Sequence, residues 1–550
     1  MLLRCIGEWL IKICFIIGNE EGRKKGRLEG WMEGRMDGGR IFLLQKYIKM
    51  KKSFGAILLL IVCFNSRAFV KPNSLFSNNM VLQRGVEVPI WGTANEGEKV
   101  TVAFCGQRVS TITMDGKWMV KLKALKINSK PSTMTISGEN SITIENILVG
   151  EVWVCSGQSN MEMMVGSAHP KPITNVREEI ANANYPAIRQ YHIAKIGSDT
   201  LVSDANTNWV VCDTFSVKNF TAVGYFFARD LYKTMKVPIG LLFTAFGGTP
   251  AENWTPRSTL ESNPEFKKIV DGYKMAMMNY PILLDSFNHN KSTILAKWAA
   301  DTLAASLAQK PIPKKPEIPR NPIGGAGGLY NAMINPLIPY AIKGVLWYQG
   351  EANNLRAKKY QILFPMMIEA WRKNWNLGEF PFLFVQIAPY REMNPAIREA
   401  QLLTLNKVSN TAMVVTTDCG DSITVHPAFK QPIGNRLSLA ARALAYHEKI
   451  EYSGPLYKSF EVKGNTIEVS FTHNGKGLMA KDGDLKGFTI SADGKNFVTA
   501  TAEIKGDKVI VYSTAVTSPK AVRYGWADFP RVNLYNMEGF PASPFRTDEE

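Results

Sequence analysis

The sequence holds few of the residues that bind metals or cross-link small folds. Its 550 residues include only seven cysteines and six histidines, and no Cys-x-x-Cys pair or cysteine–histidine cluster occurs. A zinc site needs thiolate and imidazole ligands at close spacing, so we expect no metal site. The cysteine spacing specifies no disulfide pairing either, although export would permit disulfides.

Long apolar runs and dense blocks of one charge are also missing. Hydrophobic residues make up 45% and charged residues 21%, which is typical of a soluble globular protein. The length suggests about two to four domains. The net charge of +17 is spread along the chain, and no basic block is interleaved with aromatics, which argues against a nucleic-acid partner. A dispersed basic surface can still steer anionic substrates.

The N-terminal region contains a pattern typical of a secretory signal. Met50 is followed by two lysines, by an apolar run over 54–64 and by a small-residue cleavage site at 66–68. The apolar run is shorter than the ~20 residues of a membrane-spanning helix. We expect translation to start at Met50, with residues 1–49 a gene-model extension and 50–68 the signal peptide. The mature protein would then be secreted or periplasmic, without stable membrane insertion.

Two β-rich regions flank a central region of mixed character. Residues 69–148 contain short runs of β-branched and aromatic residues, such as 88–92 and 100–104, separated by Gly and Asn. Residues 448–550 return to similar runs, for example 466–471. These punctuated patterns predict an N-terminal and a C-terminal β-sandwich.

The central region, residues 149–447, alternates apolar strands with amphipathic helices such as 360–375 and 397–408. The apolar runs alternate little, as in strands that are buried on both faces. They cover 149–155, 239–245, 342–348, 382–387 and 413–417. This order predicts an α/β core with a parallel sheet, interrupted by an insertion at about 255–325 with a flexible return.

The first of these strands runs into a glycine turn that carries Ser159. The carboxyl ends of parallel strands form the functional edge of such a sheet, and a turn there exposes a hydroxyl at the start of a helix. Backbone N–H groups at that point can stabilise an oxyanion. Ser159 is therefore a candidate nucleophile, although a serine there could simply cap the helix. The pattern is not a Gly-x-Ser-x-Gly elbow, because Met161 replaces the second glycine.

Glycine-rich or polar turns follow two other strands. Gly247 and Gly248 end one strand and permit either a tight turn or an N–H directed at an oxyanion. A second turn carries Gln349, Glu351 and Asn353. Polar groups after a buried strand form either a structural network or a site, and Asn353 could donate a hydrogen bond to the oxyanion.

The last strand leads to His426, the one histidine of six in a strand-to-helix loop at this expected edge. A lone histidine is usually structural, but the convergence of four such turns favours a site. A serine with a histidine base indicates acyl transfer. Asp421 is the nearest carboxylate and Asp418 lies behind it, so either residue, or a backbone carbonyl, could orient the imidazole.

These blocks, in this order, resemble the SGNH (GDSL-like) hydrolases and, more closely, the sialate O-acetylesterase family. The resemblance extends over about residues 70–547 and rests on motifs at 79–84, 157–161, 329–334, 347–351, 522–526 and 544–546. It implies a flavodoxin-like SGNH core flanked by β-sandwich domains. It also implies a secreted serine esterase that removes O-acetyl groups from sialic acids without a metal or other cofactor.

The resemblance also assigns roles to residues that match the family's motifs. The nucleophile and general base would be Ser159 and His426. The oxyanion hole would use Ser159, Gly247, Gly248 and Asn353. The contacts with an O-acetylated sialic acid or related glycan would come from Gln158, Gln349 and Glu351.

Two places depart from the family pattern. Phe246 stands where relatives often have Trp, which would reshape the pocket wall. Many relatives carry an acid two or three residues before the histidine, where this chain has Thr424 and Ile423. We therefore assign Asp421 to orient His426 as the third catalytic residue, and expect Asp421→Ala to lower activity much less than His426→Ala.

Two other functions are compatible with the sequence. An acetylesterase acting on another acetylated glycan, such as xylan, would share the same machinery and differ only in its pocket. A non-catalytic glycan-binding protein could keep the same domains around an inactive core, but the presence of Ser159 and His426 argues against it. The positive net charge slightly favours an anionic sugar.

Overall fold

The structure of the protein is a computed structural model that describes residues 69–168 and 171–548. The predicted extension at 1–49 and signal peptide at 50–68 lie outside these residues. Every helix in the described ranges falls short of the length or the apolarity that spanning a lipid bilayer would demand. Four cysteines of the described part are free thiols, namely Cys105, Cys155, Cys212 and Cys419.

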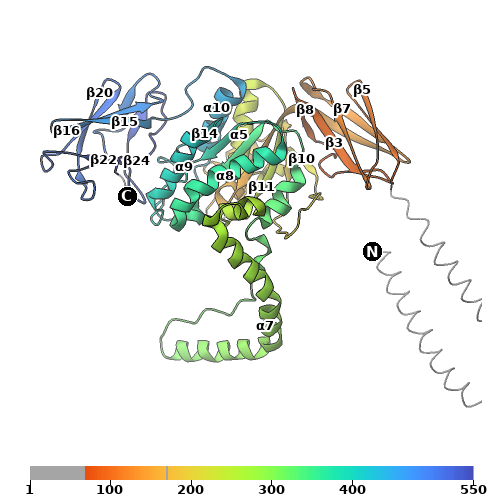
Figure 1. Ribbon diagram of the computed structural model, residues 1–550, viewed down its shortest axis with the longest axis horizontal. Helices are drawn as coiled ribbons and strands as arrows, with labels where there is room; N and C mark the ends of the chain where they lie inside the picture. Colours follow the sequence, from red (N-terminus) through yellow and green to blue (C-terminus); the bar gives the residue numbers. More distant parts are fainter. Residues whose placement is uncertain (1–68, 169–170, 549–550) are drawn as a thin grey trace, which may run out of the picture. The chain divides into compact units, whose positions relative to one another are not determined.

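The N-terminal region consists of two sheets whose apolar residues share one core (Figure 1). One sheet contains β1 (Lys71–Pro72), β3 (Val88–Thr93) and β6 (Lys117–Leu122). The other contains β2 (Val81–Gln83), β4 (Lys99–Phe104), β5 (Gln107–Ile112), β7 (Asn128–Ser137) and the first part of β8 (Ser141–Gly157). Strand β6 alternates exposed and buried residues, so one of its faces packs into the core and the other is solvated.

Strand β8 connects this region to the central sheet without a break. Its first part pairs antiparallel with β7, and its second part pairs parallel with β11 (Ile239–Ala245) and β12 (Gly344–Tyr348). Burial is mixed up to Asn146 and complete from Ile147 onward, because the second part lies between layers on both faces. The run predicted at 149–155 is therefore the second part of a longer strand that crosses the expected domain boundary.

The central sheet has the strand order β10-β9-β11-β8-β12-β13-β14. Its remaining members are β9 (Tyr185–His192), β10 (Trp209–Cys212), β13 (Phe382–Val385) and β14 (Thr411–Val414). Strand β10 is antiparallel to β9, and all other neighbouring pairs are parallel. We did not predict β9 and β10. When these two are left out and the other five are numbered by their position in the chain, their order across the sheet is 2-1-3-4-5. Strands β11 to β14 correspond to the four later predicted strands, with small shifts at their ends.

Helices cover both faces of this sheet (Figure 1). They are α5 (Ala222–Met235), α8 (Ala357–Trp375), α9 (Pro395–Lys407) and α10 (Gln431–Tyr446). Val152 and Val154 of β8 belong to the core that includes α8 and α9. Trp153 and Cys155 belong to the core that includes α5 and α10. Because successive strand residues point to opposite faces, the two helix pairs lie on opposite sides of the sheet.

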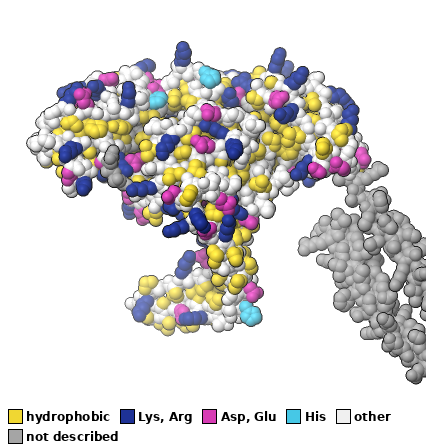
Figure 2. Space-filling model, in the orientation of Figure 1, with side chains coloured by type: hydrophobic (Ala, Val, Ile, Leu, Met, Phe, Trp, Pro, Cys, Tyr) yellow, Lys and Arg dark blue, Asp and Glu magenta, His cyan; other side chains and the backbone are white. Residues whose placement is uncertain are grey.

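The insertion predicted at 255–325 is helical for most of its length. It contains α6 (Arg257–Glu261) and the 41-residue helix α7 (Lys267–Leu307), which extends away from the core (Figure 1). Only Val270 and Tyr273 of α7 are buried, and Figure 2 shows hydrophobic side chains along its surface. The return segment, residues 310–321, has no regular secondary structure.

The C-terminal region contains two four-stranded sheets and a two-stranded pair. The first sheet contains β15 (Leu456–Lys463), β16 (Thr466–Thr472), β20 (Thr501–Lys505) and β21 (Lys508–Tyr512). The second contains β18 (Phe488–Ser491), β19 (Val498–Thr499), β22 (Ala521–Tyr524) and β24 (Phe545–Arg546). The pair is β17 (Leu478–Ala480) with β23 (Leu534–Asn536).

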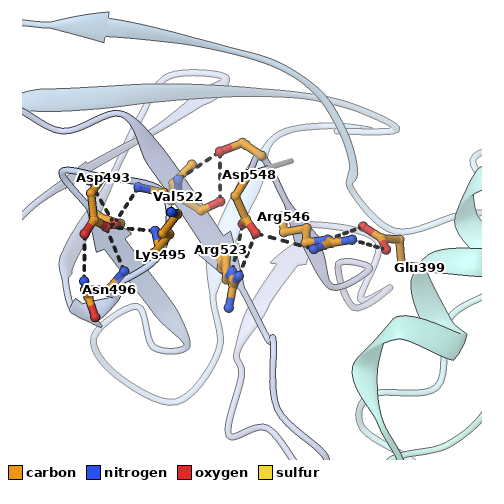
Figure 3. A network of polar contacts seen from close by, with 11 residues as sticks. Glu399, Asp493, Lys495, Asn496, Val522, Arg523, Arg546 and Asp548 are labelled. Atoms are coloured by element: carbon orange, nitrogen blue, oxygen red, sulfur yellow. Dashed lines mark hydrogen bonds and ion pairs between the residues drawn. The ribbon is translucent and has the colours of Figure 1, made fainter. Parts of the chain in front are cut away.

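An ion-pair network joins the last strand to the core (Figure 3). Arg546 of β24 donates to Glu399 of α9 through Nε (2.8 Å to Oε1) and Nη2 (3.1 Å to Oε2). Asp548 accepts from Arg523 at 2.6 Å and also pairs with Arg546. The side chain of Asp548 is only 3% exposed, so its ion pairs with Arg523 and Arg546 are poorly screened by solvent. Through Arg546, this network fixes the chain end against α9.

Candidate active site

Ser159 and His426 are in hydrogen-bond contact although 267 residues separate them. The distance between Ser159 Oγ and His426 Nε2 is 2.7 Å. Ser159 is the first residue of the short helix α3 (Ser159–Glu162), which follows β8 directly. His426 lies in the loop between β14 and α10. For Nε2 to accept the serine proton, the imidazole must carry its own proton on Nδ1.

A glycine turn allows β8 to deliver the serine at this point. Gly157 has φ of +141°, and a Cβ there would lie 2.1 Å from the carbonyl oxygen of Tyr348. No side chain fits in that space, and L-residues rarely adopt that backbone conformation. The turn therefore requires glycine and brings the start of α3 close against β12.

Asp421 shapes the loop that carries His426. Its Oδ1 accepts hydrogen bonds from the backbone N–H groups of Ile423 (2.9 Å) and Thr424 (3.3 Å), and its Oδ2 pairs with Lys171. The Lys171 ammonium, followed by these N–H groups, holds the pKa of Asp421 below its usual value. Thr424 Oγ1 in turn accepts the N–H of His426 at 3.2 Å. The carboxylate thus has partners other than the imidazole, and the orienting role that we predicted for it stays a prediction.

Asp418, the other carboxylate considered for that role, pairs with Arg436 of α10. The guanidinium donates two parallel hydrogen bonds, of 2.8 Å to Oδ1 and 2.6 Å to Oδ2. Burial disfavours the charged form, but these bonds outweigh it and lower the pKa of Asp418. Bidentate pairs of this kind have strict geometry, so Asp418 anchors α10 to the loop that follows β14.

Gly247, a predicted oxyanion donor, lies beside Ser159, but its N–H already has a partner. A Cβ on Gly247 would be 3.2 Å from Ser159 Cβ. The Gly247 N–H donates to Glu162 Oε2 at 2.5 Å, and Glu162 Oε1 pairs with Lys195 at 2.6 Å. An acidic side chain from α3 therefore occupies one of the predicted oxyanion donors.

The backbone N–H groups of Ser159 and Gly248 remain available to donate hydrogen bonds to an oxyanion. Within residues 69–168 and 171–548, neither N–H donates to another protein group. Gly248 has φ of +71°, and a Cβ at that position would meet nothing within 4 Å. These two amides are thus the predicted oxyanion donors that no protein acceptor occupies.

Asn353, the predicted side-chain donor to the oxyanion, already makes three hydrogen bonds within the protein, and its donor role stays a prediction. Its Nδ2 donates to Glu252 Oε2 at 2.8 Å, and its Oδ1 accepts from Gln349 Nε2 (2.7 Å) and from the Ala251 N–H (2.9 Å). The buried Glu252 carboxylate requires a donor, and Asn353 supplies it. Asn353 therefore connects η2 (Ala251–Trp254) to η7 (Glu351–Arg356), which follows β12.

The three residues predicted to contact substrate have different environments. Gln158 Oε1 accepts the Ala352 N–H at 3.1 Å, while Gln158 Nε2 has no partner among the described residues and is free to bind a ligand. Gln349 is fully buried in the Asn353 network. Glu351 Oε1 accepts from Asn160 Nδ2 at 2.6 Å, and its Oε2 is buried. Gln349 and Glu351 thus make hydrogen bonds within the protein, and the substrate contacts predicted for them stay predictions.

Four polar residues near the catalytic pair were not predicted. Glu162 and Lys195 lie beside Gly247, while Asn160 and Lys430 lie beneath Ser159 and His426. Asn160 lies within the family motif at 157–161, and Lys430 follows His426 by four residues, but no sequence signal distinguished them from ordinary polar positions. The described residues contain no group of three His, Cys, Asp or Glu side chains that could hold a metal ion.

Comparison with known proteins agrees with this geometry. Residues 149–284 and 320–441 match the family model of carbohydrate esterases described as sialic acid-specific acetylesterases. A sialate O-acetylesterase from Rattus norvegicus is 30% identical over 89% of this chain and 97% of its own length. The chain belongs to this esterase family. The Homo sapiens sialate O-acetylesterase is 28% identical over 86% of this chain and 91% of its own length.

A solved structure agrees with the same assignment. A carbohydrate acetylesterase from Xanthomonas citri has a TM-score of 0.74 and 31% sequence identity, covering 88% of this chain and all of that protein. The family resemblance predicted from the motifs is thus confirmed, and the protein is a carboxylic ester hydrolase. The esterase carries its serine and histidine within the segments that match the family model.

Proposed function

We propose that this esterase removes O-acetyl groups from sialic acids, with Ser159 as nucleophile and His426 as general base. The contact of 2.7 Å between Ser159 Oγ and His426 Nε2 is the observation on which the proposal rests. The family model and the relatives named sialate O-acetylesterases support the choice of substrate.

The reaction would proceed in two steps. His426 Nε2 takes the hydroxyl proton while Ser159 Oγ attacks the acetyl carbonyl, and the imidazolium then protonates the departing sugar oxygen. Water, deprotonated by the same imidazole, attacks the acetyl-serine and releases acetate. The N–H groups of Ser159 and Gly248 would hold the oxyanion in both steps, and such a donor typically contributes ~3–4 kcal/mol.

The sheet supports an SGNH-type, flavodoxin-like core. The order 2-1-3-4-5 is that of flavodoxin-like folds, whose ligands bind where the strand order reverses, next to the first strand. Ser159 follows that first strand, and His426 follows the last. Both residues therefore lie beyond the carboxyl ends of parallel strands.

A substrate panel with matched serine variants tests the proposal. We expect the wild type to release acetate from O-acetylated sialic acids, and Ser159→Ala to lose this activity at unchanged thermal stability. Ser156→Ala is the matched control, because the buried Ser156 Oγ has no hydrogen-bond partner in the described chain and its loss leaves no group unpaired. Equal activity of wild type and Ser159→Ala would refute the assignment of the nucleophile.

The same panel distinguishes the alternatives. The Xanthomonas citri neighbour is named only as a carbohydrate acetylesterase, so acetylated xylan belongs in the panel. Faster release of acetate from xylan than from sialic acids would favour the second substrate class. Binding of glycans by a wild type that hydrolyses no acetyl ester, p-nitrophenyl acetate included, would favour a non-catalytic protein.

We also propose that the esterase is exported, on the basis of the signal-like pattern at 50–68. Sequencing the N-terminus of the native protein should then find a mature start close to residue 69. A mature start well before residue 60 would contradict the signal peptide.

A further inference from the structure

Asn160 connects the two loops that carry the catalytic pair. It directly follows Ser159, and its side chain is fully buried. Asn160 Nδ2 donates to the carbonyl oxygen of Val425 at 3.0 Å, and Val425 directly precedes His426. A second hydrogen bond therefore joins the loops one residue away from the contact between Ser159 and His426.

Two buried charged groups set the orientation of this amide. Lys430 Nζ donates to Asn160 Oδ1 at 2.5 Å, and Glu351 Oε1 accepts from Asn160 Nδ2 at 2.6 Å. A flipped amide would direct its NH₂ at the ammonium and its oxygen at the carboxylate, which leaves both ions unpaired. The arrangement therefore permits one orientation, and only that orientation lets Nδ2 reach the Val425 carbonyl.

Lys430 and the carboxylate of Glu351 are both buried, so the charged form of each depends on the charge of the other and on the hydrogen bonds with Asn160. Lys430 is 1% exposed, and its Nζ lies 5.4 Å from the centre of the Tyr348 ring. Burial lowers the pKa of Lys430 to about 7, while the Glu351 carboxylate opposes that shift. Burial also raises the pKa of Glu351, against its hydrogen bond from Asn160 and the charge of Lys430. A buried ion without its partner is costly, so the amide between them is held firmly.

We propose that Asn160 is a positioning residue for Ser159 and His426, and that Lys430 and Glu351 hold its amide in the orientation that joins the two loops. The inference rests on the proposed roles of Ser159 and His426. Three loops meet at the Asn160 amide, from β8, from β12 and from the start of α10. None of the three residues needs to touch the substrate, because each acts on the distance and alignment between the serine oxygen and the imidazole.

Asn160→Ala tests the inference directly. A misplacement of reacting groups by about 1 Å can lower a rate about 100-fold, and we expect kcat for p-nitrophenyl acetate to fall by about that factor. KM should stay within about threefold, because the substrate contacts remain. The rate at which a fluorophosphonate labels Ser159 should fall in parallel, since labelling requires the same activated oxygen.

Asn536→Ala is the matched control. Asn536 is also fully buried, and its amide makes three hydrogen bonds to backbone groups, those of Ser453, His473 and Phe540, in the C-terminal region. It should lower the melting temperature as Asn160→Ala does, yet leave kcat and the labelling rate unchanged. Equal losses of kcat in both variants would overturn the inference, because they would show a general effect of destabilisation.

A double-mutant cycle tests the roles of the two ions. Lys430→Met should lower kcat about tenfold in the wild-type background and less than about twofold in the Asn160→Ala background, because it acts through Asn160. Adding Glu351→Gln to Lys430→Met removes the unpaired carboxylate and should recover most of the lost rate. The comparison of Lys430→Met with Lys430→Met/Glu351→Gln needs no change at Asn160, so it tests the inference even if Asn160→Ala does not fold.

The inference would be overturned if Asn160→Ala kept the kcat and the labelling rate of the wild type. It would also be overturned if the losses of kcat in the cycle were additive. The proposed function would stand in both cases. A wild type that neither reacts with the fluorophosphonate nor hydrolyses the ester would remove the proposed function, and the inference with it.

Discussion

Asp421→Asn exchanges one carboxylate oxygen for an amide nitrogen without changing the size of the side chain. The remaining oxygen can still accept the N–H groups of Ile423 and Thr424, so the loop keeps its shape. The variant loses the ion pair with Lys171, whose side chain is 44% exposed against 18% for Asp421. Partly exposed pairs contribute at most ~1 kcal/mol, which corresponds to a loss of about fivefold in kcat/KM.

Two further variants set the scale for this loss. Asp421→Ala also removes the two loop hydrogen bonds, each worth ~1 kcal/mol, so its loss should reach at most ~3 kcal/mol, or about 150-fold. Removing the general base with His426→Ala should cost between about 10⁴-fold and 10⁶-fold. An aspartate that orients the catalytic imidazole would behave differently, because its conversion to asparagine stabilises the wrong tautomer and costs about 10⁴-fold.

The assay is the hydrolysis of an aryl acetate at neutral pH, with kcat/KM compared for Asp421→Asn, Asp421→Ala and His426→Ala. Circular dichroism of each variant verifies that the fold is intact. We expect losses that increase in that order and differ by more than tenfold between the last two. A loss of about 10⁴-fold in Asp421→Asn would refute a role limited to shaping the loop and would support the predicted role of Asp421 in orienting His426.

Three further predictions follow from the packing around the site. Arg436→Met should lower the free energy of unfolding at pH 7 by about 3 kcal/mol, because it leaves the Asp418 carboxylate unpaired and largely buried. The pKa of Asp418 in the folded protein is below its ordinary 3.8, so the pair with Arg436 stabilises the fold above pH 3.8, and this contribution is lost as the pH falls through the lower folded pKa. Denaturant unfolding at pH 7 and pH 2 should therefore show that the difference in unfolding free energy between Arg436→Met and wild type shrinks at the lower pH. A constant difference would contradict this. Alkylation of the native protein should modify the exposed Cys105 and spare the buried Cys155, Cys212 and Cys419, as mass spectrometry would show. Burial raises the pKa of Cys419 to about 12, so rapid labelling of Cys419 in the native protein would be inconsistent with its position. Gly157→Ala should yield little soluble, active enzyme, because its Cβ would clash with backbone, and expression at wild-type level with full activity would contradict the turn geometry.

The core strands could be predicted from the sequence because their signal is local. Strands buried on both faces must be continuously apolar, so the runs that became β11 to β14 were visible without knowledge of their neighbours. Strand β9 carries polar residues among apolar ones, and the edge strand β10 has only four residues, so neither gave such a signal. The same limitation hid the continuity of β8, whose first part has one exposed face and whose second part has none.

The contact between Ser159 and His426 was predictable for a related reason. Ser159 and His426 each stand directly after a buried parallel strand, and strands of one parallel sheet deliver their carboxyl ends to one edge. The partners of the polar residues at that edge were not predictable. Asn353 was expected to donate to the oxyanion, and the sequence did not indicate that the buried carboxylate of Glu252 accepts one of its two N–H groups. The Gly247 N–H likewise donates to Glu162.

The sequence by itself determined the family, the ester-hydrolase chemistry and the pairing of Ser159 with His426, because motif residues and strand ends are properties of short segments. Only the tertiary structure decided which acceptor each buried donor serves, since that choice depends on groups brought together from distant segments. Asn160 illustrates this, because its amide lies between Lys430, Glu351 and Val425, and each of these is more than a hundred residues away along the chain. Burial leaves such groups no water to bind, so the packed fold assigns their partners.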